Sequence, residues 1–335
     1  MKKLAWFFLT TLILDSRALS QNYAVSDLGT LGGSASQTYA INNRALIVGS
    51  SVTADGGSHA FLFSNGSMTD LGIRSSLSVA TAVNASNQLA GYYYDGDYNA
   101  FVWTKGKVHD LGNLGLKYSV AYAINGLGHA CGSSKVKEGL YGAEHAFLWT
   151  GGKMTDLGTL GGKDSSARGV NGSDQVVGYA YLASGTFHAF LRTGGTMLDL
   201  GTLGGDYSYA YAINDAGQIV GAAALPDNTR THAFFSNGSG PFQDLGDLGY
   251  NVSEALALNS TGTLVVGRAT VPSNTGYTLY HAFAWNGGVM RDLNGLIPAN
   301  SDWILNEATG VNDAGVIVGN GTFGGQTRAF RLTPR

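Results

Sequence analysis

The sequence predicts an all-β protein, a seven-bladed β-propeller built from four-stranded blades. Three observations predict it: a long internal repeat, four short apolar runs in each copy, and one copy that is divided between the two ends of the chain. The repeat is marked by an Asp-Leu pair that recurs every 40 to 48 residues. The seven pairs begin at Asp27, Asp70, Asp110, Asp156, Asp199, Asp244 and Asp292. A period of about 44 residues is typical of a propeller blade.

Three further motifs follow each other in the same order in every copy. The first is an asparagine at the end of an apolar run, at Asn42, Asn84, Asn125, Asn171, Asn214, Asn259 and Asn312. The second is a glycine that closes the next apolar run, at Gly49, Gly91, Gly132, Gly178, Gly221, Gly267 and Gly319. The third is a triplet, His-Ala-Phe in five copies, that begins at His59, Asn99, His145, His188, His232, His281 and Arg328. This fixed order indicates that each copy is one structural unit.

Each copy contains four apolar runs whose length and spacing favour strands over helices. In the second copy they occupy residues 80–83, 88–90, 100–103 and 107–111. Turn residues separate the first two runs, as at 214–217, and the last two, as at 286–288. The runs are apolar on both faces, so each sheet must be covered on both sides. Radial stacking of blades provides that cover.

The last copy is divided between the ends of the chain, which predicts that the ring closes. Residues 23–29 match a fourth strand, and residues 328–332 match a third strand. Pairing of the two ends would complete the last blade and remove an unpaired edge. The alternative is an unclosed β-solenoid, which would need polar capping repeats at its ends.

The first twenty residues have the pattern of a secretory signal peptide. Lys2 and Lys3 precede an apolar block at 4–14, and small residues follow at 18–20. We therefore expect residues 1–20 to be cleaved and residues 21–335 to form one propeller domain that is extracellular or periplasmic. No later stretch approaches the roughly 20 apolar residues of a membrane helix, so we expect no membrane span.

The composition excludes nucleic acid as a partner. Charged residues make up 13% of the chain and the formal net charge is −3, so there is no basic stripe for a phosphate backbone. The single cysteine, Cys131, stands where other copies have valine, and we expect it in the core. Without a second cysteine, packing must stabilise the fold. We expect a monomer with no cofactor.

The motif set resembles that of the HAF family of extracellular repeat proteins, which is named for the His-Ala-Phe triplet. The resemblance covers essentially all of residues 21–335. It implies export, a bacterial source and a propeller-like repeat fold, and it implies no particular catalytic activity or ligand. Asn99 and Arg328 depart from the triplet.

The repeated histidines are predicted to build blades. Zinc needs three or four ligands about 2 Å from one ion, and equivalent positions in different blades lie too far apart for that. We expect each histidine to bond within its own blade, to the Asp of the Asp-Leu pair, and we expect no metal site. The repeated Asp and Asn side chains are expected to accept hydrogen bonds from turn amides.

Residues that differ from copy to copy are the better candidates for a functional site. The first such candidates are the connections between the second and third strands. These vary in length and are rich in tyrosine. Exposed rings with few charges suit a saccharide or a protein surface; the alternative is that the rings pack between neighbouring loops. The candidate ligand-binding residues are Tyr92, Tyr94, Tyr98, Tyr141, Tyr181, Tyr277 and Trp303.

A second candidate site lies on the innermost strands, five places before the turn asparagine. Only the sixth and seventh copies have a carboxylate there, Glu254 and Glu307, and Trp303 lies just before the second of them. Two carboxylates beside an aromatic ring at the mouth of a central channel are the components of a polysaccharide hydrolase or lyase. The hypotheses are thus a secreted binding module, such an enzyme, or a purely structural protein of the envelope or matrix.

Overall fold

The computed structural model describes residues 22–137, 142–273 and 278–335, and this part of the chain is almost entirely β-strand. A 3-10 helix, η2 (Leu293–Leu296), interrupts the strands late in the chain. The predicted signal peptide, 1–20, lies outside the described residues. None of the helical segments within the described ranges has the length and apolar character required to cross a bilayer.

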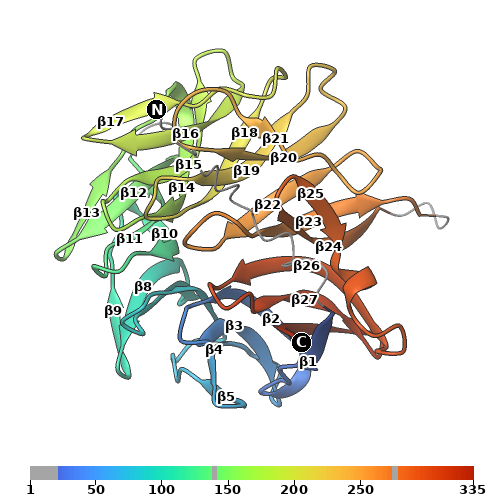
Figure 1. Ribbon diagram of the computed structural model, residues 1–335. Coiled ribbons are helices and arrows are strands. Elements are labelled where there is room, and N and C mark those ends of the chain that lie inside the picture. The colour runs from blue at the N-terminus through green and yellow to red at the C-terminus, as the bar shows by residue number, and fades with distance from the viewer. Residues whose placement is uncertain (1–21, 138–141, 274–277) are drawn as a thin grey trace, which may run out of the picture.

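The strands form antiparallel units of four, each made of two successive hairpins (Figure 1). The first two units are β2 (Gly32–Ile41), β3 (Ile47–Thr53), β4 (Ser58–Ser64) and β5 (Ser67–Asp70), then β6 (Leu77–Val83), β7 (Leu89–Tyr94), β8 (Tyr98–Thr104) and β9 (Lys107–Asp110). The next two are β10 (Gly115–Ile124), β11 (Ala130–Val136), β12 (Ala143–Thr150) and β13 (Lys153–Asp156), then β14 (Gly161–Val170), β15 (Val176–Leu182), β16 (Phe187–Thr193) and β17 (Thr196–Asp199). Two more are β18 (Ser208–Ile213), β19 (Ile219–Ala224), β20 (Thr231–Ser236) and β21 (Gln243–Asp244), then β22 (Ser253–Leu258), β23 (Val265–Val271), β24 (Leu279–Asn286) and β25 (Val289–Asp292). The predicted four strands per repeat are confirmed.

The remaining unit combines strands from both ends of the chain. It comprises β26 (Trp303–Val311), β27 (Ile317–Phe323), β28 (Gln326–Pro334) and β1 (Tyr23–Asp27), in the order β1-β28-β27-β26. β1 is antiparallel to β28, with Val25 opposite Leu332. Figure 1 shows the C-terminus beside β1 and next to β26 and β27. A single parallel bridge, Ser58 to Leu77, joins the first two units into one eight-stranded sheet.

The first strands of the units contact one another in chain order, from β2 and β6 through to β22 and β26, and β26 in turn contacts β2. These strands are therefore innermost, and the fourth strands are outermost. Each first strand thus has the first strand of another unit on either side.

The hydrophobic core lies between neighbouring units. Val48 and Ala60 of the first unit pack against Leu89 and Phe101 of the second. The phenylalanines of the triplets have no exposed surface, and they are Phe61, Phe101, Phe147, Phe190, Phe234, Phe283 and Phe330. Burial of such a side chain contributes roughly 1.5–3 kcal/mol. Cys131 is also fully buried, as predicted, and burial raises the pKa of its thiol.

Two sets of hydrogen bonds join the units. A serine on a first strand accepts from the alanine N–H of the preceding unit's triplet, for example Ser208 from Ala189 at 2.8 Å, and Ser36 from Ala329 across the two ends of the chain. The turn asparagine donates through Nδ2 to the carbonyl of the next turn asparagine, at 2.9 Å from Asn84 to Asn125. Asn312 likewise donates to the carbonyl of Asn42. Sequence reasoning gave the asparagines only local turn contacts, which they also make.

Candidate functional site

The repeated histidines bind the repeated aspartates, as predicted. Nδ1 of each triplet histidine lies 2.6–3.0 Å from the Asp carboxylate on the fourth strand of the same unit. The pairs are His59–Asp70, His145–Asp156, His188–Asp199, His232–Asp244 and His281–Asp292. The same aspartates accept from a backbone N–H two residues later, as Gly246 N donates to Asp244. These side chains therefore hold hairpins together.

The two copies without histidine supply another partner for the aspartate. The Tyr93 hydroxyl donates to Asp110 at 3.0 Å, and Arg328 pairs with Asp27 at 3.5 Å. Burial, together with the hydrogen bond to the Asp110 carboxylate, raises the pKa of Tyr93 to about 12. The repeated aspartate is thus paired in every unit, including the one formed by β1 and β28.

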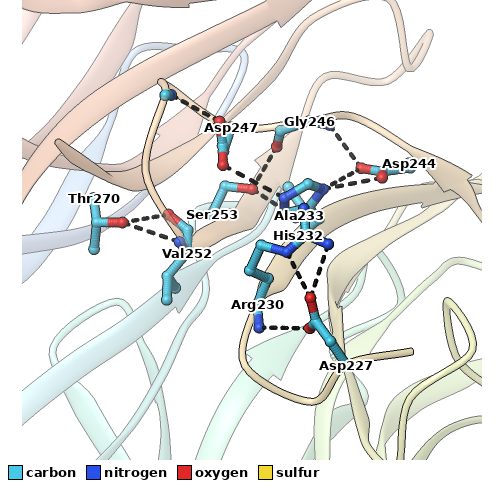
Figure 2. A network of polar contacts seen from close by, with 11 residues as sticks. Asp227, Arg230, His232, Ala233, Asp244, Gly246, Asp247, Val252, Ser253 and Thr270 are labelled. Atoms are coloured by element: carbon cyan, nitrogen blue, oxygen red, sulfur yellow. Dashed lines mark hydrogen bonds and ion pairs between the residues drawn. The ribbon is translucent and has the colours of Figure 1, made fainter. Parts of the chain in front are cut away.

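Figure 2 shows how this scaffold is tied to the next unit. His232 lies between Asp244, at 2.9 Å from Nδ1, and Asp247, at 3.5 Å from Nε2. Beside it, the Ser253 hydroxyl accepts from Ala233 N and donates to the Gly246 carbonyl. These contacts join the β20–β21 hairpin to β22, the first strand of the next unit.

The candidate tyrosines form two groups, which we name the first and second tyrosine clusters. In the first, the Tyr98 ring contacts those of Tyr92, Tyr94 and Tyr118, with centroids 5.3–5.9 Å apart. In the second, the Phe187 ring lies at the centre, 4.7–5.9 Å from the rings of Tyr179, Tyr181, Tyr207 and Tyr209. Tyr141 and Tyr277 lie outside the described residues.

Both sequence-based alternatives hold in part for these rings. Tyr94 is 41% exposed, whereas Tyr92, Tyr98 and Tyr181 are half-buried because they pack on their neighbours. Burial raises the pKa of Tyr92 to about 12, with smaller effects of nearby tyrosines. The ring is therefore a neutral phenol at physiological pH and can both donate and accept a hydrogen bond.

Each cluster borders a cavity between two units. Tyr92, Tyr98, Tyr118 and Tyr122 line one of about 240 Å³ together with Val120. The other, of about 260 Å³, has three charged residues and two tyrosines in its lining, which comprises Lys135, Gly142, Glu144, Asp164, Ser165, Tyr179 and Tyr181. Both are smaller than the roughly 300–1,000 Å³ of sites for drug-sized ligands, so they suit a small ring.

Glu254 and Glu307 lie on adjacent first strands, and Arg268 joins them. Arg268 Nε is 2.6 Å from Glu254 Oε2, and its Nη1 is 3.2 Å from Glu307 Oε2. Asn320 donates to the second oxygen of Glu307 at 3.0 Å. Trp303 stacks on Phe323 at 4.9 Å, its partner across the β26–β27 hairpin. The structure thus brings the carboxylates together and gives the tryptophan a packing role within its own sheet.

Sequence reasoning missed two arginines, Arg168 on β14 and Arg268 on β23. Arg168 lies three places before its turn asparagine, where the other copies have uncharged residues. Its guanidinium lies 3.9 Å from the centroid of the Tyr122 ring and 5.6 Å from that of Tyr179, so it contacts a ring from each cavity. Arg268 directly follows the repeated Gly267. Aligning these two positions across the copies would have revealed both charges.

The overall architecture is similar to that of known β-propellers. The β-propeller domain of the trilobed protease from Pyrococcus furiosus superposes with a TM-score of 0.57 at 9% identity, over 94% of this chain and 98% of that domain. A puromycin-hydrolyzing peptidase from Mycobacterium tuberculosis gives 0.56 at 12% identity, over 94% of this chain and 56% of the peptidase. TolB from Acinetobacter baumannii gives 0.50 at 9% identity, over 92% of this chain and 65% of TolB.

The chain therefore spans just under two thirds of TolB and about half of the peptidase. At these identities the likeness concerns the fold alone. No family model and no curated protein matches the sequence. The protein has a β-propeller fold with repeated four-stranded units.

Proposed function

We propose that the chain is a seven-bladed propeller, closed by β1 as the fourth strand of the last blade, that acts as a secreted saccharide-binding module of the HAF-repeat type. The pairing of β1 with β28 and the contact of β26 with β2 support closure. Residues 1–20 are the export signal in this proposal, and residues 21–335 are one domain that works as a monomer outside the cytoplasm.

The observation that carries the binding role is the pair of tyrosine clusters bordering cavities. Sugar rings present apolar C–H faces and a rim of hydroxyls, and an aromatic ring with a polar tip complements both. The cavities have room for one ring each, whereas a protein partner would need a far larger apolar area. This favours a saccharide over a protein surface.

The two inner carboxylates favour binding over hydrolysis. A glycosidase pair needs one carboxyl group that carries a proton for the leaving oxygen. Both oxygens of Glu307 accept hydrogen bonds from N–H donors, and Oε2 of Glu254 does so from Arg268. Both carboxylates are thus engaged as hydrogen-bond acceptors, which supports a binding role.

A glycan array followed by calorimetry tests the proposal. We expect Tyr98→Ala and Tyr181→Ala, one from each cluster, to weaken binding of an array hit by about tenfold, the loss of one aromatic contact of about 1.4 kcal/mol. Tyr250→Ala is the matched control, because Tyr250 is 49% exposed and belongs to neither cluster. Unchanged affinity in both cluster variants would remove the clusters from the site, and an array without hits would favour a structural role or a protein partner.

A further inference from the structure

Arg168, on the first strand β14, and Arg268, on the second strand β23, carry guanidinium groups in opposite electrostatic settings. Arg268 is held between Glu254 and Glu307. Arg168 forms no ion pair with any carboxylate of the described residues, and its Nε is buried without a hydrogen-bond partner. The two lie on units separated only by β18–β21, and among the described residues one guanidinium has carboxylate partners while the other has aromatic neighbours only.

An unpaired guanidinium in a half-buried site is costly, because it has lost much of its water without gaining an anion. The aromatic faces of Tyr122 and Tyr179 compensate for part of this cost. They also fix the plane of the group. A fixed planar guanidinium is well suited to bind a carboxylate through two parallel hydrogen bonds.

The first strand between the two arginines, β18, carries two stacked tyrosines. Tyr209 and Tyr211 of β18 stack with centroids 5.9 Å apart and planes inclined by 11°. Tyr209 also contacts Tyr179 at 5.1 Å, on the side of Arg168. Burial raises the pKa of Tyr209 to about 12, with further increases from neighbouring tyrosines and from Glu254. Tyr209 therefore lies between Tyr179, which contacts Arg168, and the neighbourhood of Glu254.

The acidic side offers acceptors for hydroxyl groups. Glu254, Glu307 and Arg268 together carry a formal charge of −1, and no described residue donates to Oε1 of Glu254. A ligand with two or more negative charges would be repelled there, whereas sugar hydroxyls would donate to these oxygens. The combination selects a ring with one anionic group and several hydroxyls.

We propose that the inner strands bind an acidic sugar, a uronic acid residue, with its carboxylate on Arg168, its ring against Tyr209 and Tyr211, and its hydroxyls toward Glu254. The inference deepens the saccharide-binding function proposed above and rests on it. It assigns specificity to side chains that the repeat does not share.

The test compares one oligosaccharide in two forms. An array of neutral, carboxylated and sulfated glycans identifies a uronic acid oligosaccharide, which is then titrated calorimetrically alongside its carboxyl-reduced, neutral form. We expect wild-type protein to bind the acidic form at least about tenfold more tightly. Arg168→Gln is expected to abolish that preference by weakening binding of the acidic form at least about tenfold, and Arg168→Lys to retain part of it. Arg291→Gln, at an exposed arginine of β25, is the matched control.

The outcomes separate the two proposals. Hits confined to neutral or sulfated glycans, equal binding of the two forms, or a preference that survives Arg168→Gln would each overturn the uronic acid inference and leave saccharide binding standing. An array without hits would overturn both. Should Arg168→Gln fail to fold, the wild-type protein decides, since affinity for the acidic form must fall with ionic strength and that for the reduced form must not.

Discussion

In each unit the third and fourth strands form an outer hairpin, whose polar contacts repeat, and the first and second strands form an inner hairpin, whose side chains vary. In the outer hairpins the same aspartate is paired in every unit, and even Tyr93 and Arg328, which stand in for histidine, keep the pairing. On the inner strands, Arg168 and Glu254 have no equivalents in most copies. The difference indicates that the outer hairpins are constrained by folding, while the inner side chains vary from unit to unit.

The physical basis of this freedom is the location of the core. The fully buried phenylalanines lie between units, whereas the inner-strand side chain of Arg168 and its counterparts Tyr39, Tyr122 and Tyr211 are half-buried. Changing such a side chain removes little from the packed core. A scaffold of this kind can vary its inner chemistry at small cost in stability.

The largest loss of stability is expected when a methyl group is added at one of the repeated glycines. An ideal Cβ on Gly221 would lie 1.9 Å from the Tyr209 carbonyl oxygen and 2.7 Å from the Phe234 ring. We therefore expect Gly221→Ala to lower the free energy of unfolding by at least about 3 kcal/mol, or to prevent folding. Gly295→Ala, where no atom lies within 4 Å of the added Cβ, is expected to stay within about 0.5 kcal/mol of wild type in the same denaturant titration. Equal stability of the two variants would contradict the close approach.

A smaller effect is expected from the asparagine that joins two units. Asn171 is buried; it accepts from Gln175 N and donates to the Asn214 carbonyl of the next unit at 3.2 Å. Asn171→Ala leaves these groups without partners, so we expect a loss of about 2–3 kcal/mol in denaturant unfolding. Asn113→Ala is the control, because Asn113 is exposed and makes a single contact with Gly115. If Asn171→Ala costs no more than the control, the inter-unit ladder is incidental.

The smallest expected effect is on the acid side of the stability profile. Burial alone would raise the pKa of Asp292, but hydrogen bonds from His281 and Asn294 outweigh it and hold the pKa below its usual value. The carboxylate therefore contributes stability above its unfolded pKa of about 3.9, and this contribution is lost as the pH falls through the lower folded value. We expect wild type to lose more stability between pH 6 and pH 2.5 than Asp292→Asn, as measured by urea unfolding at each pH.

Asp95→Asn, at an exposed turn, gives the background for this measurement. Parallel pH profiles for wild type and Asp292→Asn would show that the outer pair adds nothing beyond burial. The His281–Asp292 pair would then contribute no more to the free energy of unfolding than an exposed surface contact. The difference between outer and inner hairpins would in that case be one of packing only.

Much of the scaffold could be predicted from the chain because its signals are local or repeated. The period, the turn residues and the divided last copy predicted four-stranded units and the pairing of residues 23–29 with the C-terminal strand, and the structure pairs Tyr23–Asp27 there. The histidine partners were predicted because both members of each pair recur at a constant separation. The hydrogen bonds between units, such as that from Ala329 N to Ser36 Oγ, were not predicted. The sequence of one copy does not show which groups of the neighbouring copy lie beside it.

The sequence by itself determined the repeating strands, the buried position of Cys131 and the histidine partners of five outer aspartates, because these depend on patterns within one copy. Only the tertiary structure decided that Glu254 and Glu307 share Arg268, that Trp303 stacks on Phe323, and that Arg168 lies between Tyr122 and Tyr179 without an acidic partner. These contacts join residues 11 to 46 positions apart, and two of them, Arg268 with Glu307 and Arg168 with Tyr122, lie between different units. The contacts between units depend on how neighbouring sheets stack, a geometry that no single copy contains. Those of Glu254 with Arg268 and of Trp303 with Phe323 depend on the register of the two strands that carry them.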